Sequence, residues 1–319
     1  MNKVGPYLVA AATFALAGCS PGVRPAGQVQ PDSPPAQPAS QISVPKTDFD
    51  GNLSFELLKK QVAFGPRVPG SAASVSCGDW MEKTLKSYTK DVQKQPFTGK
   101  YKGSKIFMTN YIVRFNPEAK TQVVLTTHWD CRPTANEDVK LENRNKPIDG
   151  ANDGASGVAV MMELTRVFGK RPPTVGVTMV FSDGEDLGPE VDNMLLGCRY
   201  WAKHQIPKGA KYGILLDMIG KKDVRIPVEP IGYRAEPEVV KKVYTMAERL
   251  GLKDAFPFVE GDAVEDDHVP MIEAGVPTID LIDFDYPYWH TLGDTVDKCS
   301  ADSLRKVGTV IEAVLRQEL

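Results

Sequence analysis

The sequence predicts an α/β fold, organised as a single three-layer α/β/α domain around a central, mostly parallel, twisted sheet. Two observations lead to this prediction. Short apolar runs bounded by turn or polar residues alternate with longer segments in which apolar residues recur at helical spacing. Such alternation is typical of parallel sheets covered by helices on both faces. Residues 49–319 are also enough for one domain with a well-buried core, and they show no internal repeat.

Five segments have the composition of buried strands. They are short and rich in Val, Ile, Leu and Phe, which favours strands that are covered on both faces. In chain order they are Ile106–Phe115, Gln122–Thr127, Val175–Ser182, Tyr212–Asp217 and Thr278–Ile282.

Six segments have the periodicity of amphipathic helices. They are Phe55–Phe64, Ala73–Tyr88, Ala155–Phe168, Leu195–His204, Pro237–Leu250 and Ser303–Leu315. The third begins with small residues and then carries Val158, Met161 and Met162. We therefore expect this helix to pack closely on the sheet.

The first residues are typical of an export signal. Lys3 precedes an apolar stretch, Val4–Ala17, that is too short to span a bilayer. The stretch ends in Leu16-Ala17-Gly18-Cys19, which resembles a bacterial lipobox. The resemblance implies that residues 1–18 are a lipoprotein signal peptide and that Cys19 is acylated. The alternative is an ordinary secretory signal with a chance cysteine, and either interpretation predicts an exported protein.

Residues 19–48 begin with the cysteine expected to carry lipid and are rich in Pro, Gln, Ser and Ala. They have almost no large apolar side chains to offset the entropy of ordering, so we expect a disordered tether to a membrane. The expected location is the cell envelope; in a Gram-negative cell, Ser20 after the cysteine favours the outer membrane, facing the periplasm. The net charge is −3, with acidic and basic residues interspersed, so no nucleic-acid partner is expected.

Four cysteines lie in the predicted domain: Cys77, Cys131, Cys198 and Cys299. In an oxidising compartment they could form two disulfides, with three possible connectivities, or remain four buried thiols. None has Cys-x-x-Cys spacing, so none is assigned to a metal site.

Acidic and histidine side chains gather where the predicted strands end. Such ends converge at one edge of an open α/β sheet, where ligands bind. The clusters are His128-Trp129-Asp130, Asp183-Gly184-Glu185-Asp186 and Asp217, joined by Asn152-Asp153-Gly154 before a helix and by Trp289-His290 near the C-terminus. Imidazole nitrogen and carboxylate oxygen are the ligands of catalytic zinc sites. The pattern predicts a zinc hydrolase-type site with one spare glutamate.

Several of these residues have a second interpretation. Asp153 stands where a helix N-cap is expected, which is a position that favours Asp without any metal. The Glu185-Asp186 pair could be solvated surface, or one carboxylate could bind metal while the other serves as a general base. Asp130 could orient His128 as a ligand. Asp266 lies in an acidic loop that could cap a helix or face a substrate.

The clusters, in this order, resemble the zinc aminopeptidase superfamily from about Phe55 to Leu315. Finer features resemble its glutaminyl-peptide cyclotransferase (glutaminyl cyclase) branch. They are Pro66-Arg67-Val68-Pro69-Gly70-Ser71, Leu216-Asp217-Met218-Ile219-Gly220, Asp266-Asp267-His268-Val269-Pro270, and the Trp immediately before His290.

The resemblance implies a role for each matching residue. Asp153, Asp186 and His290 would bind zinc, and Glu185 would be the general acid/base. Asp266 would join a hydrogen-bond relay, and Trp289 would form a wall of the pocket. His128 and Asp217 are ligands of the second zinc in two-metal aminopeptidases, whereas in the cyclases that position is normally empty and they act as supports.

The resemblance thus implies a zinc-dependent enzyme that converts the N-terminal glutamine of peptides or proteins to pyroglutamate and releases ammonia, with one Zn2+ per chain. One alternative is an aminopeptidase with two zinc ions, in which Glu185 activates a water. Another is a non-catalytic binding domain of the envelope. The chain departs from the animal cyclases at three places: Asp186 replaces Glu, Asp280 replaces His, and the loop Leu187–Leu196 has no Trp.

Overall fold

The computed structural model describes residues 44–204 and 209–318. The predicted signal peptide, Cys19 and the tether up to residue 43 lie outside the described residues. None of the helices in the described ranges is long and apolar enough to cross a membrane.

The described part of the chain contains a six-stranded, mostly parallel sheet in the order β1-β2-β4-β3-β5-β6. The strands are β1 Val92–Tyr101, β2 Ser104–Phe115, β3 Gln122–His128, β4 Gly176–Ser182, β5 Tyr212–Asp217 and β6 Thr278–Ile282. Strand β3 pairs in parallel with β4 and β5, and β5 pairs in parallel with β6. Only β2 runs the other way, antiparallel to both β1 and β4. The predicted fold class is confirmed.

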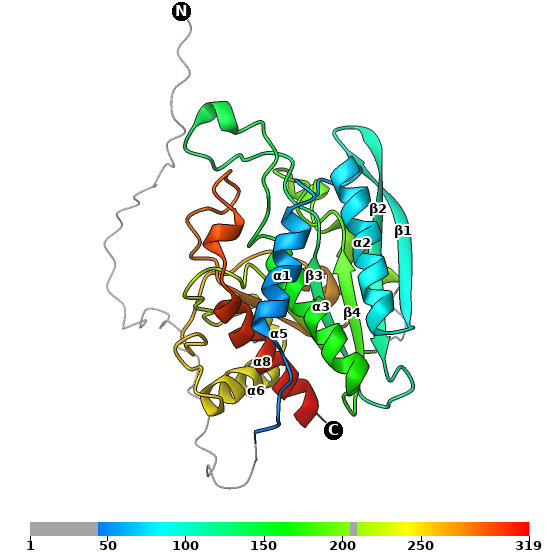
Figure 1. Ribbon diagram of the computed structural model, residues 1–319, viewed down its shortest axis with the longest axis vertical. Coiled ribbons are helices and arrows are strands. Elements are labelled where there is room, and N and C mark those ends of the chain that lie inside the picture. Colours follow the sequence, from blue (N-terminus) through cyan, green and yellow to red (C-terminus); the bar gives the residue numbers. More distant parts are fainter. Residues whose placement is uncertain (1–43, 205–208, 319) are drawn as a thin grey trace, which may run out of the picture. The chain divides into compact units, whose positions relative to one another are not determined.

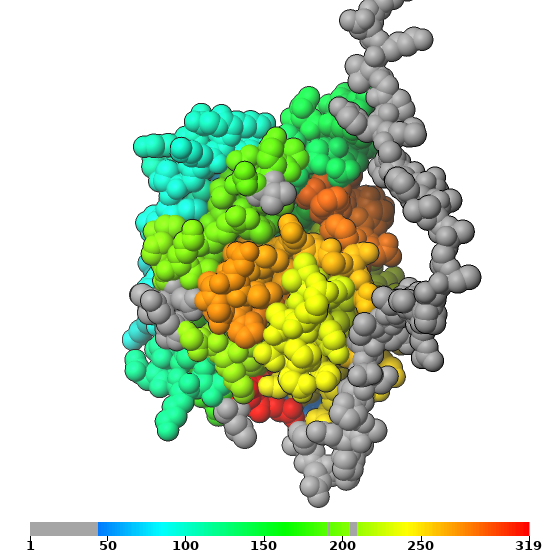
Figure 2. All heavy atoms as spheres, turned by 180° about the vertical axis from the view of Figure 1, so that it is seen from behind, coloured from blue at the N-terminus to red at the C-terminus, as the bar shows by residue number. Residues whose placement is uncertain are grey.

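Helices cover both faces of the sheet, as the alternating sequence pattern predicts. They are α1 Gly51–Val62, α2 Ala72–Tyr88, α3 Ala155–Lys170, α4 Leu196–Lys203, α5 Pro230–Ala235, α6 Pro237–Arg249, α7 His268–Glu273 and α8 Ala301–Gln317, with short 3-10 turns η1 Leu141–Asn143, η2 Val191–Asn193 and η3 Val296–Lys298. In Figure 1, α1, α2, α3 and α8 lie in front of the sheet. Figure 2 shows the opposite face, on which α7 lies beside α4.

Side chains of each central strand alternate between two apolar cores. In β3, Val123 and Leu125 belong to the large core beneath α1, α3 and α8, whereas Val124 between them belongs to the smaller core with Trp201 and Met271. Because successive side chains of a strand point to opposite faces, strands buried on both sides read as continuous apolar runs. That is why the central strands are visible in the sequence.

Strand β1 and helix α5 were not among the predicted elements, and α7 was considered only as the helix that the acidic loop around Asp266 could cap. In β1 only Phe97 is buried, so this edge strand has no apolar alternation to reveal it. Its pairing depends on the backbone register with β2 and on a two-residue turn, Lys102-Gly103, with φ of 48° and 79°. Helices α5 and α7 have six residues each, too few to show a helical period.

The start of α3 packs directly against two strand ends and thereby positions the loop before it. A Cβ on Gly157 would lie 2.2 Å from Thr127 Oγ1 and 2.3 Å from the carbonyl oxygen of Leu216. Only glycine allows this approach. The close packing expected of this helix therefore brings Asp153 to the carboxyl ends of β3 and β5.

Candidate metal centre and active site

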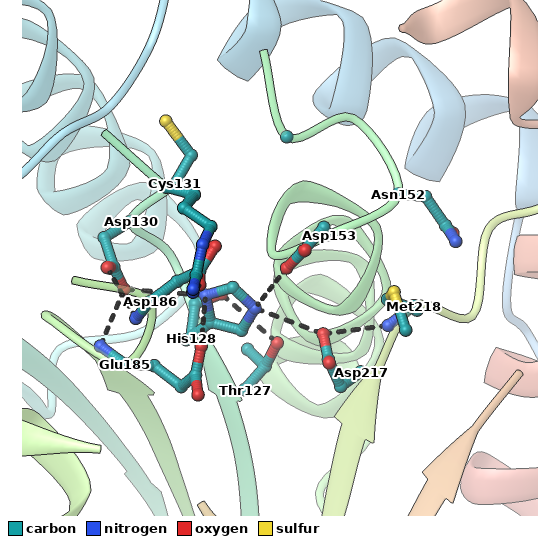
Figure 3. Close-up of polar contacts among 12 residues, drawn as sticks. Thr127, His128, Asp130, Cys131, Asn152, Asp153, Glu185, Asp186, Asp217 and Met218 are labelled. Carbon is teal, nitrogen blue, oxygen red and sulfur yellow. Dashed lines mark hydrogen bonds and ion pairs between the residues drawn. The ribbon is translucent and has the colours of Figure 1, made fainter. Parts of the chain in front are cut away.

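The carboxyl ends of three adjacent parallel strands bring together several of the predicted site residues, namely His128, Asp153, Glu185, Asp186 and Asp217 (Figure 3). His128 is the last residue of β3 and Asp217 the last of β5. Glu185 and Asp186 follow β4, and Asp153 precedes α3. These are the strand ends at which open α/β sheets bind ligands.

One set of possible metal ligands consists of Asp153, Asp186 and His290. Nε2 of His290 lies 3.3 Å from Oδ1 of Asp186 and 3.5 Å from Oδ2 of Asp153. All three side chains are buried. His290 has a positive φ of 52°, a region that non-glycine residues adopt at an energetic cost and that is frequent at functional sites.

A second set consists of His128, Asp153 and Asp217. Nε2 of His128 lies 3.1 Å from Oδ1 of Asp217 and 3.2 Å from Oδ1 of Asp153. Burial lowers the pKa of His128, but the neighbouring carboxylates of Asp217, Asp130 and Asp153 outweigh burial and hold that pKa well above its ordinary value. Asp153 belongs to both sets, with a different oxygen toward each histidine.

The donors in these two sets fit a zinc ion. In each set, one atom from every residue lies within 4.8 Å of the others. Oδ2 of Asp153 and Oδ2 of Asp186 are buried and have no hydrogen-bond partner. Buried polar atoms are normally satisfied, and an imidazole with carboxylates is the donor set of a catalytic zinc site. A cation at this position would satisfy both oxygens.

Glu185 lies beside the ligands without belonging to either set. Its Oε2 is 3.9 Å from Nδ1 of His128, and its side chain is almost fully buried. Burial raises the pKa of Glu185 well above its ordinary value, His128 opposes this change, and the nearby charge of Asp266 adds to it. A carboxyl group held in such surroundings exchanges a proton more readily near neutral pH, as general acid/base catalysis requires.

Hydrogen bonds bear on two of the sequence interpretations. The N-cap of α3 is Gly154, without a side-chain capping bond, so Asp153 is not the helix cap. Asp130 lies 3.5 Å from His128 Nδ1. Its two oxygens also accept the backbone N–H groups of Glu185 and Asp186, each at 3.1 Å. Asp130 therefore holds the loop after β4 as well as facing the histidine.

Asp266 is buried close to the site and is not a helix cap. Its Oδ1 accepts the backbone N–H of Asp267 at 2.6 Å, and its Oδ2 has no partner. Burial raises its pKa well above the ordinary value, and Asp217 and Asp267 add to that rise. The N-cap of α7 is Asp267, whose side chain makes no capping bond and instead accepts the hydroxyl of Ser182.

Trp289 stands against the histidine that follows it. The two rings stack with centroids 3.8 Å apart and an interplanar angle of 25°. Phe284 meets the indole edge-on at 5.1 Å, and Val264 packs in the same apolar cluster. Two aromatic rings, Trp289 and Phe284, therefore lie beside His290 of the first ligand set, and the pocket wall that the resemblance implies for Trp289 stays a prediction.

Arg132 is a site residue that the sequence reasoning missed. Its buried guanidinium pairs with Oδ1 of Asp186 through Nη1, and its Nε donates to Oδ1 of Asn136 at 2.6 Å. The signal was its position two residues after Asp130, within the same polar cluster.

Arg67, known from the sequence only as part of a motif, is fully buried. It donates to the backbone carbonyls of Trp129, Asp149 and Gly150. The four cysteines Cys77, Cys131, Cys198 and Cys299 are all buried and free.

Comparison with known proteins agrees with this geometry. Residues 110–315 match the model of peptidase family M28. The structure of Tannerella forsythia glutaminyl cyclase superposes with a TM-score of 0.82 at 35% identity and covers 85% of this chain and 99% of its own. A Zn-dependent exopeptidase from Parabacteroides distasonis ATCC 8503 superposes with a TM-score of 0.82 at 34% identity, covering 86% and 100%.

Among curated proteins, the chain is 24% identical to a mouse glutaminyl-peptide cyclotransferase-like protein, over 79% of this chain and 72% of that protein. The family match spans most of the domain, and the similarity to the bacterial cyclases extends over nearly the whole of their chains. The protein therefore belongs to peptidase family M28, in the branch that contains the glutaminyl cyclases.

Proposed function

We propose that this protein is a zinc-dependent glutaminyl-peptide cyclotransferase, which converts the N-terminal glutamine of peptides or proteins to pyroglutamate and releases ammonia. The observation that carries the proposal is the ligand set of Asp153, Asp186 and His290, with Glu185 buried next to His128 and Trp289 stacked on His290. Similarity to solved bacterial glutaminyl cyclases over most of the domain supports it.

Asp153, Asp186 and His290 would hold one zinc ion. When bound, zinc supplies Lewis-acid polarisation of the side-chain amide carbonyl of the substrate glutamine. His128 and Asp217 support this ligand set, because His128 contacts Asp153 and Asp217 contacts His128.

Glu185 moves the proton in the reaction. Its carboxylate takes a proton from the α-amine of the substrate, and the α-nitrogen forms a bond to the side-chain amide carbon. Glu185 then returns the proton to the amide nitrogen, the bond to that nitrogen breaks, and ammonia leaves. The buried carboxyl of Asp266 lies near enough to influence the charge of Glu185, which suits a relay partner.

No external water takes part, because the attacking amine belongs to the same residue as the amide. The protein therefore has to select a reactive conformer and keep water away. The aromatic wall formed by Trp289 and Phe284 suits both tasks.

The decisive assay follows the masses of two peptides incubated with zinc-loaded protein, one beginning with Gln and one with Leu. We expect the first to lose the mass of ammonia and the second to stay unchanged. Release of free Leu would reassign the protein to the aminopeptidases. If neither peptide changed, a non-catalytic binding role would replace the proposal.

Glu185→Gln should lower turnover of the Gln peptide by about 10²–10⁴-fold, the usual contribution of a general acid/base. Its zinc content should stay unchanged, because Glu185 belongs to neither ligand set. Glu190→Gln is the matched control, since Glu190 lies in the same loop with an exposed side chain. Retention of most activity by Glu185→Gln would refute the assignment of the base.

An aminopeptidase with two zinc ions is the second candidate, because the second ligand set is also complete. In that enzyme Glu185 would activate a metal-bound water. Metal analysis of the purified protein separates the two: about one zinc per chain favours the cyclotransferase, and about two favours the peptidase.

We further propose that the protein is a lipid-anchored lipoprotein of the cell envelope. The lipobox-like Leu16-Ala17-Gly18-Cys19 and the Pro-rich segment after it support this proposal. Membrane fractionation tests it: Cys19→Ala should move the protein from the membrane to the soluble fraction. An unchanged distribution would contradict acylation of Cys19.

A further inference from the structure

Asp294 has no part in the chemistry above, yet its side chain is fully buried beside the site. It accepts three hydrogen bonds: the backbone N–H of Asn152 at 2.9 Å, the backbone N–H of Asp153 at 3.1 Å, and the hydroxyl of Tyr286 at 2.7 Å. Its own carbonyl accepts the N–H of Ala151 at 3.4 Å. Asp294 thus accepts hydrogen bonds from the N–H groups of three consecutive residues, Ala151, Asn152 and Asp153.

These bonds determine how the chain runs through Asp153. The segment lies between Gly150 and Gly154, both with positive φ (59° and 88°), and it belongs to no strand or helix that could satisfy its N–H groups. Buried N–H groups without a partner are costly. Asp294 therefore removes a cost that the conformation placing Asp153 between the two histidines would otherwise carry.

A second carboxylate repeats this arrangement on the other ligand loop. Asp130 accepts the consecutive N–H groups of Glu185 and Asp186. Asp130 follows His128 by two positions and Asp294 follows His290 by four. The aspartate after each histidine thus binds the backbone of a carboxylate ligand of the first set: Asp130 binds that of Asp186, and Asp294 binds that of Asp153.

We propose that Asp294 is a positioning residue: it fixes the backbone of Asp153 so that each carboxylate oxygen faces its own metal position, independently of whether metal is present. In the test below, the measurement of kcat rests on the proposed function, whereas the measurement of zinc affinity does not.

The test compares zinc dissociation constants, measured by competition with a chromophoric chelator, for the wild-type protein and Asp294→Asn. The variant keeps the size of the side chain but replaces one of the two accepting oxygens with an NH2 group. That group cannot accept, so the N–H of Asn152 or of Asp153 loses its partner. We expect zinc binding to weaken by about 10–100-fold, the usual effect of losing a group that orients a metal ligand. At saturating zinc, kcat for the Gln peptide should fall by a similar factor, while KM changes little.

Two further variants separate positioning from general destabilisation. Tyr286→Phe removes one bond but leaves both N–H groups with their acceptor, so its effect on zinc affinity should be smaller than that of Asp294→Asn. Glu312→Gln is the matched control, because buried Glu312 accepts the consecutive N–H groups of Asp48 and Phe49.

Glu312 also pairs with Arg171. Arg171 follows the last residue of α3, and the start of α3, which adjoins Asp153, is roughly 24 Å away by the rise of a helix of this length. Glu312→Gln should therefore lower thermal stability and leave the zinc affinity unchanged. Wild-type zinc affinity and kcat in Asp294→Asn would overturn the proposal. So would an equal loss of zinc affinity in Glu312→Gln. If the wild-type protein left Gln peptides unchanged, the proposed function would fail, and the zinc affinities would still decide the role of Asp294.

Discussion

At the scale of single residues, Asp153 is the residue that the two ligand sets share. Its two oxygens face two different histidines, His128 and His290. A single carboxylate between two nitrogen donors can serve either one metal ion or two. The two candidate functions, cyclotransferase and two-zinc peptidase, therefore differ in whether a metal ion binds on the His128 side of Asp153.

Arg132 offers a residue-scale prediction about charge. Its guanidinium neutralises Asp186, and both groups are buried. Removing one partner of a buried pair leaves an uncompensated charge, which typically costs about 3–5 kcal/mol. We expect Arg132→Met to lower the free energy of unfolding by this order in metal-free protein. The loss should be smaller with zinc, because the metal then supplies positive charge to Asp186.

Urea unfolding of the metal-free and zinc-loaded proteins measures the two losses. Arg305→Met is the control: Arg305 pairs with Asp302 on the exposed side of α8, and such surface pairs contribute about 1 kcal/mol or less. Equal losses for Arg132→Met with and without zinc would mean that Arg132 acts through packing rather than charge.

At the scale of elements, α3 connects helix packing to the metal centre. Gly157 in its first turn touches the ends of β3 and β5, and Gly169 near its last turn would place a Cβ 2.3 Å from the carbonyl of Tyr88. Alanine at either position gains helix propensity of about 1 kcal/mol. It also forces a contact far below van der Waals distance with rigid backbone, so the steric cost should prevail.

We predict that Gly157→Ala and Gly169→Ala each destabilise the protein, by about 1–3 kcal/mol as overpacked cores usually do. Only Gly157→Ala should also weaken zinc binding, because displacement of the first turn moves Asp153. Thermal unfolding and chelator competition provide the two measurements. An equal change in zinc affinity in both variants would contradict the idea that the start of α3 sets the ligand position.

At the scale of the whole molecule, buried carboxylates fasten the N-terminal segment to the domain. Glu312 accepts the N–H groups of Asp48 and Phe49, and Glu163 accepts that of Asp50 at 3.0 Å. Both glutamates are fully buried. Arg171 adds bonds to the carbonyl of Lys46 and to the side chain of Asp48. These bonds join residues 46–50 to the domain, and the boundary predicted at residue 49 stays a prediction.

A truncation series tests this boundary. A chain that begins at Val44 keeps these contacts and should melt like the full-length protein. A chain that begins at Gly51 loses the three N–H donors and leaves two buried carboxylates with fewer partners. Each unsatisfied group costs about 1–3 kcal/mol, so the melting temperature should fall by several degrees at least. Equal melting temperatures would show that the carboxylates find replacement donors.

The sequence by itself determined which strands and helices form the centre of the domain. Strands β3 to β6 and helices such as α3 and α8 are visible because burial on both faces produces continuous apolar runs, and burial on one face produces helical periodicity. Strand β1 escaped notice because only Phe97 is buried in it and its pairing is made by the backbone, which carries no sequence signal.

The sequence also determined the identity of the candidate ligands, since zinc donors are side chains and a strand end brings His128 or Asp217 to the same edge of the sheet. Only the tertiary structure decided how they are shared and supported. Asp153 lies between two histidines, and Arg132 pairs with Asp186. Asp130 accepts a backbone N–H from a residue that is 55 positions away in the sequence, and Asp294 accepts one from a residue that is 142 positions away. Every residue except proline offers the same N–H group, so the partner of such a bond depends on how the chain folds.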